Sequence, residues 1–309
     1  MPPSWLYCAL VRFRRLAYDR GWLKSRRPPV PVIVVGNLTV GGTGKTPLVV
    51  WLAAFLSHRG HRPGIITRGY GGRGAEWPRW VTKDCDPIEV GDEPVLLARR
   101  SGCPVVAGPD RVAAAEMLAA TCGCDMIVSD DGLQHYRMER DLEILVVDAL
   151  RGFGNGRCLP AGPLREPASR RYEVDLTVGN GGPWPGGQVM ELVPGRLVGL
   201  GDRGRFRDLS ELRRQRVTAV AGIGNPERFF VLLRRHGLHL DERPYPDHHC
   251  FTREEVASWP AGPVIMTEKD AVKCESFARH NHWYLPVDAR LDSGFEGLLS
   301  DKLKGIENG

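Results

Sequence analysis

The sequence predicts an α/β fold: a mostly parallel sheet flanked by helices, a second, smaller α/β domain and an amphipathic N-terminal helix. The unbroken apolar runs at 32–35, 126–128 and 144–147 are typical of strands buried on both faces of a parallel sheet. A glycine-rich segment and an apolar helix follow the first run. Strand-like and helical segments alternate again after residue 217, which favours a second domain of the same class.

Length and composition agree with two domains. The 309 residues are 42% hydrophobic, which is enough for a large core. Glycines and prolines are frequent between residues 179 and 205, as expected of a domain junction. We therefore predict an N-terminal helical segment at 1–30, a first domain at 31–205 and a second domain at 206–309.

The eight cysteines are scattered, without a C-x-x-C pair, and no cleavable signal peptide precedes them. This pattern favours reduced thiols in a cytosolic protein over a disulfide framework. Cys122 and Cys124 are only one residue apart and have no nearby partner ligands. They make a weak case for zinc.

Basic charge is concentrated at the N-terminus. The net charge is +5, and residues 1–31 hold seven basic side chains against one acid, Asp19. On a helical wheel one face carries Trp5, Leu6, Ala9, Leu10, Phe13, Leu16 and Ala17. Such a helix is expected to lie in a membrane interface with its arginines on anionic headgroups. It could alternatively pack on the domain, or bind nucleic acid, although no recognition motif follows it.

The segment after the first strand is typical of a phosphate-binding loop, which makes the first domain P-loop NTPase-like. Glycines let backbone N–H groups surround phosphate oxygens, and the following helix adds the positive end of its dipole. We expect ATP to be bound by Thr39, Val40, Gly41, Gly42, Thr43, Gly44, Lys45 and Thr46. Lys45 would reach the outer phosphates and Thr46 would bind Mg²⁺. Thr39 replaces the first glycine of the usual pattern, so a simple glycine-rich turn is the alternative.

Carboxylates occur at two further points. Asp130 and Asp131 end an apolar strand, where a P-loop enzyme holds magnesium directly or through water. Asp92 and Glu93 precede Pro94 and a helix, so on their own they are well explained as an acidic helix start.

Two loops carry further candidates. Arg165 and Glu166 end a loop rich in glycine and proline, and they would serve phosphate and metal or form a surface ion pair. His248 and His249 follow Asp247. The two histidines could form a metal pair, although adjacent histidines on a strand point to opposite faces. A histidine oriented by a carboxylate could assist a general base, and a plain polar loop is the alternative.

Taken together, these motifs resemble the tetraacyldisaccharide 4′-kinase family of the lipid A pathway in Gram-negative bacteria. The resemblance extends to about residue 275 and rests on GNLTVGGTGKTP, RGYGG, GDEP, SDDGLQH, GPLREP, DHH and TEKDA, in that order. It implies ATP- and Mg²⁺-dependent phosphorylation of a disaccharide hydroxyl on a membrane lipid. It also implies a peripheral or monotopic protein on the cytoplasmic face of the inner membrane, with no obligate protein partner and no nucleic acid.

The resemblance also implies roles for single residues. Asp92 corresponds to the base that accepts the sugar proton, assisted by a histidine of the DHH segment. By its place after the aspartate we take this to be His248, with His249 not excluded. Asp130 and Asp131 correspond to the acidic metal and active-site positions, Arg165 to a phosphate contact, and Glu166 to a magnesium ligand.

Two other classes of protein compete with this interpretation. A membrane-associated P-loop ATPase switch of the partition or cell-division type carries a signature lysine where this chain has Val40. A non-catalytic membrane adaptor would have no use for the carboxylates at 92, 130, 131 and 166. Both alternatives are therefore less favoured than the kinase.

Overall fold

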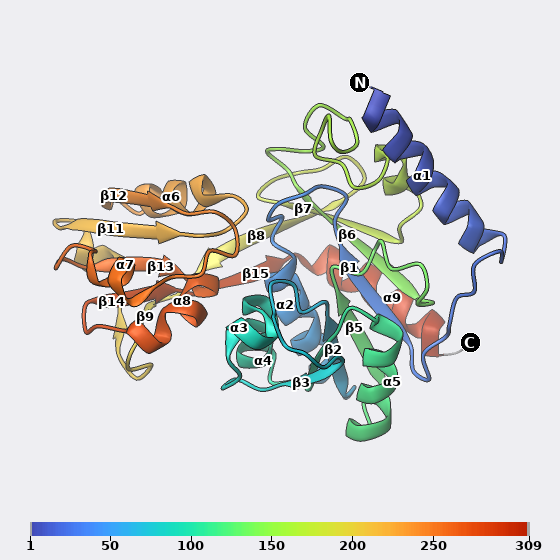
Figure 1. Ribbon diagram of the computed structural model, residues 1–309, viewed down its shortest axis with the longest axis horizontal. Helices are drawn as coiled ribbons and strands as arrows, with labels where there is room; N and C mark the ends of the chain where they lie inside the picture. The colour runs from blue at the N-terminus through green and yellow to red at the C-terminus, as the bar shows by residue number, and fades with distance from the viewer. Residues whose placement is uncertain (1, 308–309) are drawn as a thin grey trace.

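The computed structural model describes residues 2–307, which form two lobes of unequal size (Figure 1). The larger lobe contains a nine-stranded sheet and the smaller lobe a six-stranded sheet. In both sheets the central strands run parallel, and antiparallel pairs occur toward the edges. The predicted α/β class, with a large, mostly parallel sheet flanked by helices, is confirmed.

The larger sheet has the strand order β15–β8–β7–β6–β1–β5–β2–β4–β3. Its strands are β1 (Val32–Gly36), β2 (Pro63–Thr67), β3 (Arg79–Val81), β4 (Val105–Ala107), β5 (Met126–Asp130), β6 (Leu142–Asp148), β7 (Leu176–Asn180), β8 (Gln188–Pro194) and β15 (Val287–Leu291). The register places Val35 of β1 opposite Asp130 of β5. The glycine-rich loop and the acidic end of β5 therefore meet at one edge of the sheet.

Helices cover both faces of this sheet. They are α2 (Lys45–His58), α3 (Pro87–Val90), α4 (Asp92–Ser101), α5 (Arg111–Cys122) and α9 (Ser293–Glu307), with a 3₁₀ turn at Ala168–Tyr172. Ile33 and Val35 enter the core under α2, α4 and α9, whereas Val32 and Val34 enter the core under α5. Burial on both faces explains why β1 is apolar at every position.

The smaller lobe has the strand order β10–β9–β14–β13–β11–β12. Its elements are β9 (Leu197–Gly199), β10 (Phe206–Arg207), β11 (Arg216–Ala221), β12 (His239–Pro244), β13 (Val264–Thr267), β14 (His282–Leu285), α6 (Pro226–Arg235), α7 (Arg253–Ala257) and α8 (Glu268–Cys274), with 3₁₀ turns at Leu209–Leu212 and Glu275–Phe277. Its two cores hold Phe229, Phe230 and Trp283 on one side and Phe251 and Trp259 on the other.

The domain boundaries differ from the predicted 31–205 and 206–309. β9 already belongs to the smaller sheet, whereas β15 and α9 return to the larger lobe. β15 pairs with β8, and Phe295, Leu299 and Leu303 of α9 are buried in the core that contains Ile33. The smaller lobe is therefore an insertion between β8 and β15, because the apolar face of α9 is buried against the larger sheet. Residues 1, 308 and 309 of the predicted ranges lie outside the described residues.

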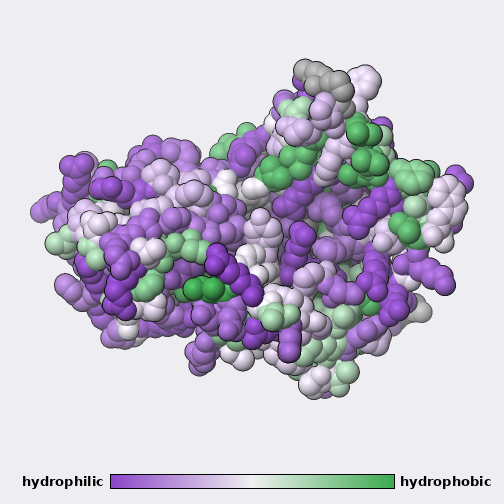
Figure 2. Space-filling view, in the orientation of Figure 1, coloured by the Kyte–Doolittle hydropathy of each residue, from purple (hydrophilic) through white to green (hydrophobic). Residues whose placement is uncertain are grey.

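Helix α1 (Pro2–Asp19) presents its apolar face to solvent, and Figure 2 shows apolar side chains gathered over it at the upper right. Trp5 is 80% exposed and Phe13 61%. The helix packs on the larger lobe through its other side, where Ser4 Oγ donates to the Cys158 carbonyl at 2.6 Å. Of the predicted apolar face only Ala17 is buried, so packing of that face on the domain is excluded. No helix within residues 2–307 has the length and hydropathy needed to span a membrane.

Candidate active site

The glycine-rich loop joins β1 to α2 and is held by a side chain from β7. Gly41 and Gly44 have φ angles of 95° and 88°, which glycine adopts without strain. Asn180 donates to the Thr43 carbonyl at 2.8 Å, and a Cβ at Gly44 would lie 2.1 Å from the Asn180 Nδ2. A side chain at position 44 would therefore collide with the residue that fixes the loop.

The conformation of Thr39 explains why this loop lacks the first glycine of the usual pattern. It forms an antiparallel bridge with Leu164, and the next residue, Val40, donates its N–H to the Pro163 carbonyl at 2.8 Å. Thr39 has no positive φ, so this position does not need glycine. The segment that carries Arg165 thus lies directly against the loop.

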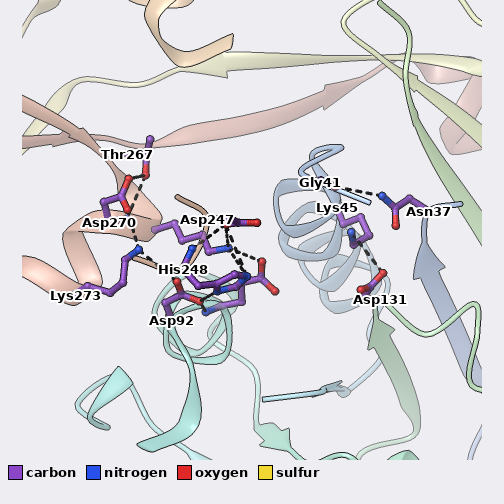
Figure 3. A network of polar contacts seen from close by, with 12 residues as sticks. Asn37, Gly41, Lys45, Asp92, Asp131, Asp247, His248, Thr267, Asp270 and Lys273 are labelled. Atoms are coloured by element: carbon purple, nitrogen blue, oxygen red, sulfur yellow. Dashed lines mark hydrogen bonds and ion pairs between the residues drawn. The ribbon is translucent and has the colours of Figure 1, made fainter. Parts of the chain in front are cut away.

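Asp131 lies between two cations at the mouth of the loop. Its carboxylate is 3.4 Å from Lys45 Nζ and 2.8 Å from an Arg165 nitrogen (Figure 3 shows the pair with Lys45). Burial opposes ionisation, but Lys45 and Arg165 outweigh it and hold the pKa of Asp131 well below its usual range. Two cations and a carboxylate beside a glycine-rich loop make a site for the outer phosphates of a nucleotide.

Asp130 and Glu166 are more deeply buried than Asp131. Asp130 Oδ1 has no hydrogen-bond partner within the described chain, and burial raises the pKa of this carboxyl. Glu166 is 1% exposed and accepts hydrogen bonds from Gln134, at 3.0 Å, and from Tyr136. Glu166 and Arg165 therefore have different partners and do not form the surface ion pair that composition alone allowed.

The other end of the site contains a carboxylate–histidine pair. His248 Nδ1 lies 3.0 Å from Asp92 Oδ1, although the two residues are 156 positions apart. Asp92 occupies the first turn of α4, after the N-cap residue Gly91, and is 4% exposed. Burial opposes its charge, but the hydrogen bond with His248 and the ammonium groups of Lys269 and Lys273 lower the pKa of Asp92 to about 2. Asp92 therefore not only begins α4 but also pairs with His248 and lies near two lysine ammonium groups.

The two histidines of the DHH segment diverge. His249 Nε2 lies 2.9 Å from Glu255, and its ring stacks on Tyr245 with centroids 4.7 Å apart. His248 has a φ of 59°, and this left-handed turn directs it toward Asp92, while the half-buried His249 packs on Tyr245 and Phe251 of the smaller lobe. The sequence left open which of the two histidines contacts Asp92, and in the structure it is His248. The two rings point to different partners and therefore do not form a joint metal site.

Sequence reasoning assigned no role to several residues around this pair. Lys269 Nζ lies 2.9 Å from Glu93, 3.1 Å from Asp247 and 3.3 Å from His248 Nε2. Lys273 Nζ is 3.6 Å from Asp92. The TEKDA motif contains Lys269 and was its only sequence signal, whereas Lys273 follows the motif by two residues and had none. A lysine beside acidic residues at a helix start otherwise looks like a solvated surface residue.

Both ends of the site open into one cleft of 1340 Å³. The larger lobe contributes the glycine-rich loop and Arg165, and the smaller lobe contributes His248 and Lys269. The lobes approach closely, because a Cβ at Gly224 of the smaller lobe would lie 2.5 Å from the backbone nitrogen of Gly42. A nucleotide on the loop and a polar acceptor near His248 can therefore share one cleft.

Comparison with known proteins agrees with this arrangement. The sequence profile of the family described as LpxK, tetraacyldisaccharide-1-P 4′-kinase, matches residues 1–304. The chain belongs to this family. It is 54% identical to the tetraacyldisaccharide 4′-kinase of Nitrosococcus oceani, over 95% of this chain and 87% of that one. Identity to the Alkalilimnicola ehrlichii kinase is also 54%, over 99% and 96%.

A solved structure extends the comparison to the fold. It is a crystal structure of LpxK from Aquifex aeolicus in complex with ATP. It superposes with a TM-score of 0.80 at 30% identity, and the match covers 99% of this chain and 97% of the other. The prediction of a tetraacyldisaccharide 4′-kinase, made from the motifs, is confirmed by these relatives. The roles given to single site residues stay predictions.

Proposed function

We propose that this chain transfers the γ-phosphate of ATP to the 4′-hydroxyl of a tetraacylated glucosamine disaccharide 1-phosphate. The product is lipid IVA, an intermediate of lipid A biosynthesis. The observation that carries the proposal is the single cleft with the P-loop lysine at one end and, at the other, His248, which is bonded to Asp92. The relatives named above support the choice of substrate.

The larger lobe binds the nucleotide in this proposal. Residues 39–46 surround the phosphates with backbone N–H groups, and the N-terminus of α2 adds its dipole. Lys45 and Arg165 neutralise charge on the transferred group. When ATP is absent, Asp131 holds both cations in place, so that little rearrangement is needed on binding.

The acceptor hydroxyl loses its proton to the pair at the other end. Asp92 accepts it, and His248, which lines the cleft, assists. A carboxylate with a low pKa is a weak base. It is sufficient here because phosphoryl transfer depends mainly on alignment and charge neutralisation, and the proton leaves late in a loose transition state.

The residues around the loop fit a magnesium ion. Asp130 presents a buried oxygen without a hydrogen-bond partner, an oxygen donor of the type that Mg²⁺ prefers. Thr46, Asp131 and Glu166 would complete the protein's share of the ligands. When bound, Mg²⁺ would supply positive charge that offsets the charge of the outer phosphates.

The chain is proposed to act as a peripheral or monotopic protein on the cytoplasmic face of the inner membrane. The exposed apolar residues of α1 suit insertion among headgroups, and Arg12 and Arg14 on the same helix suit anionic lipid. Tyr7 Oη of α1 also donates to the Arg165 carbonyl at 3.1 Å. The helix therefore holds the cleft close to the surface where the lipid substrate resides.

Transfer of label from ATP to the tetraacylated disaccharide 1-phosphate tests the reaction. We expect a product that carries one labelled phosphate in addition to the 1-phosphate, that depends on acceptor, ATP and Mg²⁺, and that disappears with a chelator. ATP hydrolysis that is independent of the acceptor would instead indicate the ATPase switch, and the absence of turnover would indicate the adaptor.

A separate experiment tests the membrane part. Trp5→Glu with Phe13→Glu should shift the protein from anionic vesicles into the supernatant and weaken action on vesicle-bound lipid severalfold, because each charge opposes insertion. Leu298→Glu is the matched control, since Leu298 is a 45%-exposed leucine on α9, away from α1. Unchanged vesicle binding by the α1 variant would assign membrane binding to another surface.

A further inference from the structure

A buried lysine of α8 lies against the proton-accepting carboxylate and has no part in the transfer described above. Lys273 Nζ lies 3.6 Å from Asp92 Oδ2 and 2.9 Å from Asp270 Oδ1, and its side chain is 8% exposed. Figure 3 shows Lys273 between the two carboxylates, with Asp270 on its own helix and Asp92 on the helix of the other lobe.

Asp270 is in turn fixed by the smaller lobe. It is completely buried, and its Oδ2 accepts hydrogen bonds from the Gly222 N–H at 2.8 Å and from the Thr267 hydroxyl at 2.6 Å. A carboxylate held by two donors and an ammonium has little freedom to move. Lys273 is therefore held at a defined position, with its nitrogen 5.3 Å from the ring centre of Phe251.

The two oxygens of Asp92 have different neighbours. Oδ1 accepts the Glu93 N–H at 2.9 Å and faces His248 Nδ1 at 3.0 Å. Oδ2 has no hydrogen-bond partner among the described residues and faces the Lys273 ammonium. Two hydrogen bonds therefore hold Oδ1, and the charge of Lys273 attracts Oδ2, so that the lysine favours one rotation of the carboxylate. This rotation decides where His248 lies in the cleft, because the imidazole is bonded to one oxygen only.

Other charges near Asp92 are arranged differently. Lys269 lines the cleft and contacts Glu93, Asp247 and His248, so a bound acceptor can touch it directly. Neither Lys273 nor Asp92 is among the described residues that line the cleft, whereas His248 is. Lys273 therefore acts on the cleft through its contact with Asp92 and the contact of Asp92 with His248.

We propose that Lys273, fixed by Asp270, is a positioning residue that holds the Asp92 carboxylate in the orientation needed to orient His248 and accept the sugar proton. This inference rests on the proposed function. Because Lys273 belongs to the smaller lobe and Asp92 to the larger one, the proton acceptor is correctly oriented only while the lobes are in contact.

The test measures kcat and the KM for ATP in the phosphotransfer assay, with Lys273→Met, Lys273→Gln and Lys273→Arg. The first variant removes charge and donor, the second keeps a donor, and the third keeps the charge. We expect Met and Gln to lower kcat about tenfold with the KM for ATP nearly unchanged, and Arg to recover most of the loss. Lys302→Met is the matched control, because Lys302 forms an exposed ion pair with Asp175 outside the site.

A double-mutant cycle separates positioning from a purely structural role. In an Asp92→Asn background, Lys273→Gln should have little further effect on kcat, because its target is already inactive. The same fold-loss in both backgrounds, or wild-type kcat in Lys273→Gln, would overturn the inference. If Lys273→Met does not fold, the Gln variant and the cycle decide the question. Failure of the wild-type chain to phosphorylate the lipid would instead overturn the proposed function.

Discussion

The phosphate-binding end of the cleft comes almost entirely from one lobe, whereas the proton-accepting end takes its residues from both. Asp131 pairs with Lys45 and Arg165, all from the larger lobe, and the loop rests on buried strand β1. By contrast Asp92 begins α4, and His248, Lys269 and Lys273 come from the smaller lobe. One end is therefore built by folding of a single lobe and the other by the docking of two.

The contact between the lobes is rich in ion pairs. Arg99 pairs with Glu275 at 2.6 Å, Arg100 with Glu268 at 2.5 Å, and Lys269 with Glu93 at 2.9 Å. Polar interfaces of this kind permit relative motion of domains more readily than apolar ones. The comparison teaches that nucleotide binding and proton acceptance can be disturbed separately, and substitutions at each end test this.

The largest effect is expected from the phosphate end. Lys45→Ala removes the cation that neutralises the outer phosphates and leaves Arg165 paired with Asp131. Transfer should fall by on the order of 10³-fold or more, measured as kcat/KM with labelled ATP. Near-normal transfer by this variant would mean that residues 39–46 do not form the phosphate site.

The next effect concerns Asp92. Asp92→Asn keeps the shape and the hydrogen bonding of the side chain but cannot take up a proton. Its kcat should fall on the order of 10²–10⁴-fold, the usual contribution of a general base, with ATP affinity nearly intact. A variant that instead raises the KM for ATP would place Asp92 in the nucleotide site and erase the contrast between the two ends.

The phosphate-binding end could be predicted from the sequence more fully than the proton-accepting end, because its residues are close together in the chain. The loop was predictable because residues 32–46 are contiguous, and strand, glycines, Lys45 and helix all follow one another in the chain. The acids at 130 and 131 were predictable because they end an apolar run. No local pattern could show that Asp92 meets His248, and only the family resemblance indicated it.

The misplaced boundary has a related cause. The segment 287–307 contains an alternating strand and an amphipathic helix, which could cover either sheet by pattern alone. Only three-dimensional packing decides that Phe295 and Leu299 enter the core of the larger lobe. Lys273 was missed because its neighbours cannot be identified from the sequence. It lies against Asp270 of its own helix and Asp92 of the other lobe.

A smaller effect is expected from the histidine. His248→Ala removes the partner of Asp92 Oδ1 while the carboxylate remains, so kcat should fall less than in Asp92→Asn. The double variant should fall by less than the product of the two losses, because paired groups act as a unit. His249→Ala is the matched control and should be milder, since His249 contacts Glu255. Multiplicative losses would show that the two residues act independently.

The smallest expected effect is on the free energy of unfolding in acid. It reports on the proton-accepting end of the cleft, which the two lobes build together. Asp92 has a folded-state pKa of about 2, against an ordinary value of 3.8. A lowered folded-state pKa stabilises the native state above the ordinary value, and that stability is lost as the pH falls toward the folded value. Between pH 5 and pH 3 the loss through Asp92 alone should be about 1 kcal/mol.

Asp92→Asn has no carboxyl at this position. Between pH 5 and pH 3 its free energy of unfolding should therefore fall by about 1 kcal/mol less than that of the wild-type protein. Urea unfolding of both proteins at pH 5 and pH 3 measures the difference. Asp131 titrates in both proteins, and its contribution therefore cancels. Because the cations that lower the pKa of Asp92 come from the smaller lobe, an equal acid dependence in the two proteins would mean that the lobes are not docked around Asp92 in solution.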